Sequence, residues 1–378
     1  MGTDWMLILK GFEMASTSRL PPLPALRDFI HMYQLRATKV LSQNYIMDMN
    51  INRKIVRQSG LRPNGYALEI GPGPGGITRA ILEKNPKRFD VVEIDRQFEE
   101  PLEVLREASN DTLHIHIQDA LKTDLGDIMD SANLEPNPWW DQPPNYHVIG
   151  NLPFNIASPL IIKLLREMTW RRGPWKYGRV PLTLTFQLEV AKRICAPVDC
   201  DERTRISIVS QFVSEPKLTF VIPGRCFVPK PQVDVGVVTF IPREEPLIDT
   251  SFEVVEKVAR HVFHYRQKYV IQPIKTLYPK EMADDMANDM LKHCRINPKW
   301  KPYYLGLPDF ADLCTFYEKQ CRETPGLFAY NYFGQGHRTL AELSTGPNAF
   351  PPVFEILKEK QPNFKEGISL AQANRRTN

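Results

Sequence analysis

Residues 66–76 read Tyr66-Ala-Leu-Glu-Ile70-Gly-Pro-Gly-Pro-Gly-Gly76, and a helical pattern opens near Ile77. The first five residues form the near-continuous apolar run of a strand buried on both faces, as in a parallel α/β sheet. The glycines that follow let the main chain turn sharply and approach a ligand closely. Three of them satisfy the G-x-G-x-x-G pattern of nucleotide-binding loops. The stretch therefore predicts an α/β fold with a ligand loop after its first strand.

Six further strand-like runs cover residues 89–94, 113–117, 147–150, 182–186, 218–222 and 235–241. Helical patterns lie between several of them, which predicts helices layered on a mostly parallel sheet. The pattern then changes to short helical segments broken by prolines. We predict a sheet domain over residues 26–245, a small all-α domain over 246–333 and a mostly disordered tail over 334–378. Residues 1–25 are predicted to be an N-terminal extension that can hold a targeting segment.

Composition narrows the classes of function. The length of 378 residues favours two domains, and the net charge of +4 permits an anionic partner without demanding one. The six cysteines show neither CxxC spacing nor a His/Cys cluster, so we expect reduced thiols and no metal site. No apolar run reaches the length of a membrane span, so no membrane partner is expected.

Acidic residues follow the second and third predicted strands. Glu93, 22 residues after Gly71, can accept hydrogen bonds from ribose hydroxyls, and Asp119 can accept from an adenine amino group. Pro72 and Pro74 replace residues whose amides would cradle a pyrophosphate, which favours S-adenosylmethionine over a nicotinamide dinucleotide. Two structural alternatives remain: an exposed strand-end charge at position 93 and a helix N-cap at 119.

The fourth strand leads into Asn151-Leu152-Pro153-Phe154. An exocyclic amine is a poor nucleophile, because its lone pair is delocalised into the purine ring. The Asn side-chain oxygen and the Leu152 carbonyl can accept both amine hydrogens and aim the nitrogen at a methyl group. The proline stiffens the loop, and the phenylalanine offers a ring face for a base. The alternative is a simple strand-ending turn, for which Asn and Pro are common.

A second aromatic residue, Phe227, precedes two prolines that stiffen the chain at positions 229 and 231. A flipped adenine could lie between Phe154 and Phe227, since enzymes that modify a base extract it from its stack. The alternative, in which Phe227 is a core residue, stays open. No histidine is needed as a general base, because the amine loses its proton after it becomes cationic.

The motifs resemble those of the small-subunit rRNA adenine N6,N6-dimethyltransferases, in the same order, over residues 20–330. The matching segments are Ser42-Gln43-Asn44-Tyr45-Ile46, Glu69-Ile-Gly71-Pro-Gly73, Val92-Glu93-Ile94-Asp95, Gln118-Asp119-Ala120, Asn151-Leu-Pro-Phe154 and Phe227-x-Pro-x-Pro-x-Val233. Segments 19–24, 138–144 and 174–179 look like the mitochondrial branch of that family. Two departures are mild: Phe154 stands where many members have Tyr, and Tyr45 where Phe is usual.

The resemblance implies a Rossmann-like, seven-stranded class I methyltransferase domain followed by a small all-α domain. It implies S-adenosylmethionine as cofactor, S-adenosylhomocysteine as product and no metal. The expected cofactor-binding residues are Gln43, Asn44, Ile46, Gly71, Gly73, Glu93, Ile94, Asp119, Ala120 and Asn151. The expected catalytic residues are Asn151, Leu152, Pro153, Phe154 and Phe227.

The resemblance also implies a substrate and a location. We expect dimethylation of two adjacent adenines in the 3′-terminal hairpin of mitochondrial small-subunit rRNA, free or in a pre-ribosomal small subunit, within the mitochondrial matrix. Basic clusters are predicted to bind this RNA through Arg171, Arg172, Lys176, Arg179, Arg260, Arg266 and Lys268, although a solvated charged face is an alternative for any one cluster.

Two other classes of function compete with this hypothesis. One is a non-catalytic nucleic-acid-binding factor that works with the mitochondrial transcription machinery, as the transcription-factor name given to members of this branch suggests. Intact Glu93, Asp119 and Asn151 argue against a purely non-enzymatic role. The other is a nicotinamide oxidoreductase, which the glycine loop alone would equally allow.

Overall fold

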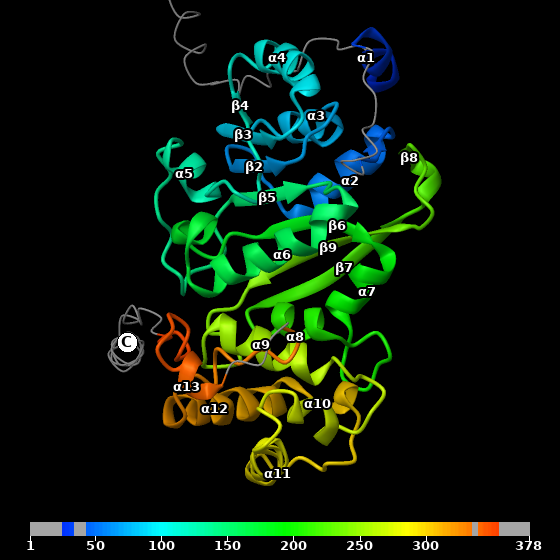
Figure 1. The fold of residues 1–378 in the computed structure, drawn as a ribbon. Coiled ribbons are helices and arrows are strands. Elements are labelled where there is room, and N and C mark those ends of the chain that lie inside the picture. The colour runs from blue at the N-terminus through cyan, green and yellow to red at the C-terminus, as the bar shows by residue number, and fades with distance from the viewer. Residues whose placement is uncertain (1–24, 34–42, 335–338, 355–378) are drawn as a thin grey trace, which may run out of the picture.

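The computed structural model describes residues 25–33, 43–334 and 339–354. Its centre is a seven-stranded sheet with the order β4-β3-β2-β5-β6-β9-β7 (Figure 1). Strand β9 is antiparallel to both of its neighbours, and the other pairs are parallel. The bounds are β2 Tyr66–Ile70, β3 Arg88–Glu93, β4 Leu113–Ile117, β5 Tyr146–Gly150, β6 Leu182–Gln187, β7 Ser214–Ile222 and β9 Val235–Pro242. All seven strands predicted from the apolar runs are confirmed.

The two faces of the sheet carry separate hydrophobic cores, because successive side chains of a strand point to opposite sides. In β2, Tyr66, Leu68 and Ile70 face one core, and Ala67 faces the other. The first core contains residues of α5 (Leu125–Asp130), α6 (Phe154–Thr169), α7 (Leu188–Cys195) and α8 (Arg205–Gln211). The second contains residues of α2 (Met49–Ser59), α3 (Gly76–Leu82) and α4 (Glu99–Ala108). Helices therefore cover both faces, as predicted. The short α1 (Leu26–Met32) precedes them.

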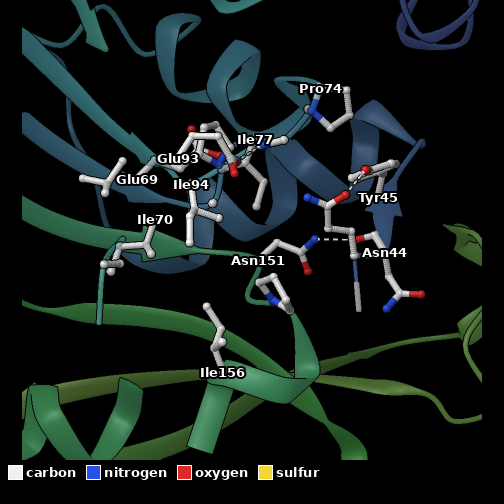
Figure 2. Close-up of a pocket in the computed structure, with 18 of the residues that line it drawn as sticks. Asn44, Tyr45, Glu69, Ile70, Pro74, Ile77, Glu93, Ile94, Asn151 and Ile156 are labelled. Carbon is white, nitrogen blue, oxygen red and sulfur yellow. Dashed lines mark hydrogen bonds between the residues drawn. The ribbon is translucent and has the colours of Figure 1, made fainter. Parts of the chain in front are cut away.

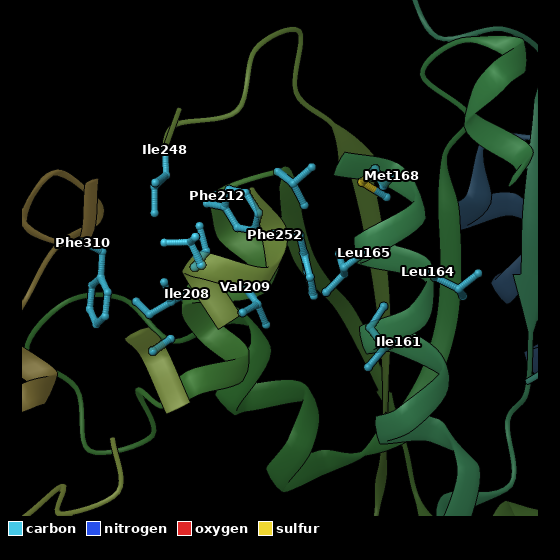
Figure 3. Packing of buried hydrophobic residues seen from close by; sticks show 14 of the residues in the cluster. Ile161, Leu164, Leu165, Met168, Ile208, Val209, Phe212, Ile248, Phe252 and Phe310 are labelled. Carbon is cyan, nitrogen blue, oxygen red and sulfur yellow. The ribbon is translucent and has the colours of Figure 1, made fainter. Parts of the chain in front are cut away.

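After β9 the chain is helical. The bounds are α9 Phe252–Val262, α10 Ile271–Lys275, α11 Ala283–His293 and α12 Leu307–Glu323. Apolar residues of these helices belong to the first core of the sheet. Phe212, at the end of α8, packs on Phe252 of α9 (Figure 3). Buried Arg203 donates hydrogen bonds to the carbonyl oxygens of Leu305 and Ala196. The helical part is therefore continuous with the sheet domain through one apolar core.

Two very short strands, β1 (Tyr45–Ile46) and β8 (Phe227–Val228), form a separate antiparallel pair. Tyr45 lies opposite Val228, and Ile46 lies opposite Phe227. The sequence patterns did not predict these strands, because two residues are too few to establish a period. The pairing fixes the segment before α2 against the loop that precedes β9.

Residues 339–354, part of the tail predicted to be mostly disordered, have a defined fold in the structure. They include α13 (Leu340–Leu343), and the Gly326 N–H donates to the carbonyl oxygen of Ala349 at 2.9 Å. The Phe354 ring meets Trp170 edge-on, with centroids 5.2 Å apart. The few apolar side chains of this stretch are enough to hold it in place, because they pack against residues of the folded domains such as Trp170. The predictions for residues 1–24 and 355–378 lie outside the described residues.

Candidate functional site

A cavity lies at the carboxyl ends of β2, β3, β4 and β5, where open α/β sheets bind ligands. It encloses about 980 Å³, including its open mouth. Figure 2 shows its residues converging from the glycine loop, the strand ends and the segment around Asn44. All ten residues predicted to bind the cofactor line it: Gln43, Asn44, Ile46, Gly71, Gly73, Glu93, Ile94, Asp119, Ala120 and Asn151. The structure therefore brings these residues together in one cavity.

The glycine loop forms the floor of this cavity through backbone conformations that other residues rarely adopt. Gly71 has a φ of 71° and Gly73 a φ of 52°, both in the left-handed region. A Cβ on Gly73 would lie 3.3 Å from the Tyr45 ring. The absence of side chains here keeps the main chain open to a ligand.

Two buried carboxyl groups face the cavity from neighbouring strands. Glu93, only 4% exposed, accepts hydrogen bonds from the N–H of Gly73 at 3.0 Å and of Asp95 at 2.9 Å. Glu69 accepts from the hydroxyl of Thr78 at 2.8 Å. Burial raises the pKa of Glu93 to about 7 and that of Glu69 to about 8. The hydrogen bonds that these two carboxyls accept come from neutral N–H and O–H groups.

Asp119 lines the cavity just after β4. Its Oδ1 accepts from the Leu121 N–H at 2.9 Å within a turn, and the helix that follows, α5, is capped by Asp124 and not by Asp119. Lys163 of α6 donates to the carbonyl oxygens of Ala120 and Thr123 and holds this loop. Beside it, Ile94 is 48% exposed although apolar, a surface that suits a flat aromatic ligand.

Asn151 also lines the cavity and follows directly after β5. Its Nδ2 donates to the carbonyl oxygen of Asn44 at 2.8 Å, and its Oδ1 accepts from the Thr185 hydroxyl at 2.8 Å. Pro153 also lines the cavity, whereas the Leu152 side chain is buried in the first core. Phe154 begins α6 and is half-buried against the second core. The carboxamide is therefore held from two sides in the lining of the cavity.

Phe227 does not face Asn151 as a free platform in this structure. It is 2% exposed and belongs to the second core, opposite Ile46. Neither Phe154 nor Phe227 lines the cavity. The core alternative for Phe227 therefore describes this conformation, because β8 turns its ring inward while the neighbouring Val228 points to solvent. The predicted pair of phenylalanine rings around a base is not assembled here.

In the basic cluster at 171–179, Arg179 is buried within the fold, while Arg172 and Lys176 stay exposed. Arg179 is 8% exposed and donates to the carbonyl oxygens of Trp139, Asp141 and Pro242. The interleaved aromatics of this segment, Trp175 and Tyr177, are buried as well. A buried guanidinium that already donates to three carbonyl groups is poorly placed to reach a phosphate, and sequence alone could not show this burial.

The other members of this cluster are also engaged. Arg171 lies over the Trp139 ring at 4.5 Å, Arg172 lies over Trp170, and Lys176 pairs with Asp130. In the helical part, Arg260 packs over the Phe333 ring. Arg266 lines a second groove with residues of α7, and Lys268 is exposed. Of the predicted RNA contacts, Arg172, Lys176 and Lys268 are exposed, whereas Arg260 and Arg266 are half-buried.

We expect Arg179→Met to destabilise the protein without a specific loss of RNA binding. The change leaves three main-chain carbonyl groups without their charged donor, which costs about 2–4 kcal/mol of unfolding free energy. Urea unfolding followed by tryptophan fluorescence measures the loss. Lys268→Ala is the matched control, with unchanged stability and weaker RNA binding. A stable Arg179→Met variant with poor RNA affinity would restore the original prediction.

Sequence reasoning missed two residues that support the site, Thr185 and Lys163. Neither lies in a recognisable motif, and each acts from the element next to the one it supports. One signal was present for Thr185: it is a polar residue inside an apolar strand next to the catalytic loop. In the described ranges, no group of three or more His, Cys, Asp or Glu residues is placed to hold a metal. Within the same ranges, no helix has the length and apolar character needed to cross a membrane.

Comparison with known proteins gives the family. A family model described as ribosomal RNA adenine dimethylase matches residues 34–311. "Dimethyladenosine transferase 1, mitochondrial" of Caenorhabditis elegans is 61% identical and covers 91% of this chain and 94% of that protein. The human protein of the same name is 44% identical, and the match covers 84% of this chain and 91% of the human protein.

Solved structures agree on the fold. A dimethyladenosine transferase from Plasmodium falciparum has a TM-score of 0.56 at 23% identity, covering 72% of this chain and 97% of that one. The 23S rRNA methyltransferase ErmE has a TM-score of 0.50 at 19% identity, covering 72% and 99%. The Rossmann-like methyltransferase fold is thus confirmed, and the names of the close relatives confirm the mitochondrial location. The chain belongs to the ribosomal RNA adenine dimethylase family and is an rRNA adenine dimethyltransferase.

Proposed function

We propose that the protein uses S-adenosylmethionine to dimethylate N6 of two adjacent adenines in the 3′-terminal hairpin of mitochondrial small-subunit rRNA. The observation that carries this proposal is Asn151, held by hydrogen bonds to Asn44 and Thr185 in the lining of a cavity that also contains Glu93 and Asp119. The reaction takes place in the mitochondrial matrix and supports assembly of the small ribosomal subunit.

The cavity fits this methyl donor better than a dinucleotide. Among the described residues, its lining contains the acids Glu69, Glu93 and Asp119 and neither Lys nor Arg. S-adenosylmethionine carries a sulfonium and an ammonium group, which favour such acidic surroundings, whereas a pyrophosphate would be repelled. When bound, the cofactor supplies a methyl group activated by the sulfonium. This charge balance also weakens the nicotinamide oxidoreductase hypothesis.

The chain would hold the donor through groups already in place. Glu93 lines the cavity and can accept hydrogen bonds from ribose hydroxyls beside the N–H groups that it already binds, because a carboxylate has about four lone-pair sites. Asp119 can accept from the adenine amino group while Ile94 covers the ring. The glycine loop allows the remaining part of the ligand to approach the main chain.

Asn151 would orient the substrate amine. Its Oδ1 accepts one hydrogen bond from Thr185 and retains a second lone pair for an N6–H of the target adenine. Drawing the amine hydrogens to fixed acceptors favours tetrahedral nitrogen and directs its lone pair towards the methyl group. The proton leaves once the nitrogen is cationic, so no strong general base is required.

We expect cofactor affinity to rise from pH 6 to about pH 8. Burial raises the pKa of Glu93 to about 7 and of Glu69 to about 8, so both are partly protonated at neutral pH without ligand. A cationic ligand favours their ionised forms, and binding therefore releases protons. Calorimetry in buffers of different ionisation enthalpy measures that release.

S-adenosylhomocysteine, which lacks the sulfonium charge, serves as the control and should show a weaker pH dependence. The same raised pKa values have a consequence for the free protein. Because the folded state binds more protons than the unfolded state between about pH 4.5 and 8, stability without ligand falls as pH rises through this range. Affinity that is independent of pH would contradict the proposed response of the two carboxyls.

The proposed RNA contacts are Arg266, Lys268 and Arg260 of the helical part. Arg266 lies in a groove with Leu188 and Glu189, which follow the carboxyl end of β6, the strand beside the catalytic loop. Four acids also line this groove, Glu189, Asp201, Glu202 and Asp234, so the proposed contacts are made by the basic side chains themselves and not by the groove as a whole. Structured RNA is bound largely through phosphate and shape.

The test is methylation of the rRNA hairpin. Protein is incubated with labelled S-adenosylmethionine and either the hairpin or a version with both adenines replaced by guanine. We expect dimethyladenosine only from the first RNA, detected by mass spectrometry of nucleosides. RNA binding without dimethyladenosine, on both the free hairpin and isolated pre-ribosomal subunits, would refute the proposal. No described feature favours the alternative of a transcription factor, which predicts that Asn151→Ala keeps every cellular activity.

A further inference from the structure

Thr185 is a buried hydroxyl residue on β6 that makes contact with the catalytic carboxamide. The parallel register places Gly150 of β5 opposite Leu184 of β6, so Thr185 lies beside Asn151. Its side chain is fully buried, and its Oγ1 is 2.8 Å from the Asn151 Oδ1. It does not line the cavity. The contact of Thr185 with the site is therefore made through Asn151.

The main chain of Asn44 determines which way the Asn151 carboxamide points. A carbonyl oxygen only accepts hydrogen bonds, so the group 2.8 Å from it must be the Nδ2 donor. The Oδ1 then faces Thr185, whose hydroxyl must donate, because an amide oxygen cannot. The result is an ordered chain of hydrogen bonds from Thr185 through Asn151 to Asn44, whose members polarise one another.

We propose that Thr185 is a positioning residue for methyl transfer, which fixes the Asn151 oxygen in the orientation that receives the target amine. The proposal rests on the function of Asn151 proposed above. Without the hydroxyl, the carboxamide keeps only the bond to Asn44 and can swing about it. The oxygen then spends less time where it orients the amine, and turnover falls while cofactor binding, made mostly by Glu93 and Asp119, persists.

Thr183 offers a matched control on the same face of the same strand. It is also buried, and its hydroxyl lies 3.3 Å from that of Thr239 on β9. Replacing either threonine with valine removes one buried hydroxyl and keeps the shape of the side chain. Each change also leaves a polar neighbour without its partner, so both should destabilise the fold to a similar degree. Only one of the two hydroxyls touches Asn151.

The experiment compares Thr185→Val, Thr185→Ser and Thr183→Val in the hairpin assay, with unfolding midpoints measured alongside. We expect Thr185→Val to lower kcat about tenfold with cofactor Kd within about threefold, since one buried hydrogen bond is lost. Thr185→Ser should recover kcat to within about threefold, and Thr183→Val should keep it.

A wild-type kcat in Thr185→Val would overturn the proposal, as would an equal loss of kcat in Thr183→Val or no recovery in Thr185→Ser. Combining Thr185→Val with Asn151→Ala gives a further check: the valine should have no additional effect once the carboxamide is gone. If Asn151→Ala itself is fully active, the function proposed for Asn151 fails. If it is inactive and Thr185→Val is normal, only the positioning of Asn151 by Thr185 fails.

Discussion

Asn151→Ala lowers kcat for adenine methylation by about 100- to 1000-fold, the range seen when one preorganised hydrogen-bonding group is lost from a catalytic site. The change removes the oxygen that would accept the amine hydrogen and breaks the link to Asn44. Cofactor affinity should fall much less, because the acids at the strand ends remain. Single-turnover methylation of the hairpin, with calorimetry of cofactor binding, separates the two effects.

Asn151→Asp sharpens this test. It keeps oxygen acceptors but places a carboxylate where an N–H now donates to the Asn44 carbonyl. The repulsion should turn the group away, so kcat falls although an acceptor is present. Asn145→Ala is the control, since its side chain only bridges residues 62–63 to the chain before β5. Full activity of both Asn151 variants would exclude this residue from catalysis.

Glu93→Ala weakens S-adenosylmethionine binding by about 100-fold. The carboxylate would make two charge-assisted hydrogen bonds to the ribose, each worth about 1.5–3 kcal/mol, part of which water recovers in the variant. It also anchors the N–H groups of Gly73 and Asp95, so the glycine loop loosens. Calorimetric titration measures Kd.

Glu83→Ala is the control for Glu93→Ala. Glu83 is an exposed carboxylate paired with Arg53, away from the cavity, and its loss should leave Kd unchanged. Glu93→Gln should fall between the two, because an amide oxygen still accepts a hydrogen bond but carries no charge. An unchanged Kd in Glu93→Ala would place the cofactor elsewhere.

The sheet and the cofactor residues could be predicted because each leaves a local trace. A strand buried on both faces needs an apolar run, and a close main-chain turn needs glycine at positions such as Gly71. Parallel strands then bring their carboxyl ends to one edge of the sheet, so Glu93 and Asp119 could be expected to lie in the same cavity. The resemblance to a known family gave the substrate and the location, which no residue pattern contains.

Burial and pairing across the fold could not be predicted in this way. Arg179 reads as a surface cation until three carbonyl groups are found around it. Phe227 fits a stacking platform equally well until β8 turns its ring inward. The function proposed for Thr185 cannot be inferred from its own strand, because its hydrogen-bond partner, Asn151, follows the neighbouring strand β5. Each depends on contacts between residues far apart in sequence, which single-sequence periodicity does not encode.

The pair formed by β1 and β8 has a thermodynamic consequence. Tyr45 and Ile46 line the cofactor cavity on one side, while Ile46 lies opposite Phe227 on the other. Any rearrangement that exposes the Phe227 ring to a base must therefore disturb a wall of the cofactor cavity. Binding of the cofactor and binding of a base against Phe227 are therefore linked, and such linkage is reciprocal. If the bound cofactor changes the affinity for RNA by some factor, bound RNA changes the affinity for the cofactor by the same factor.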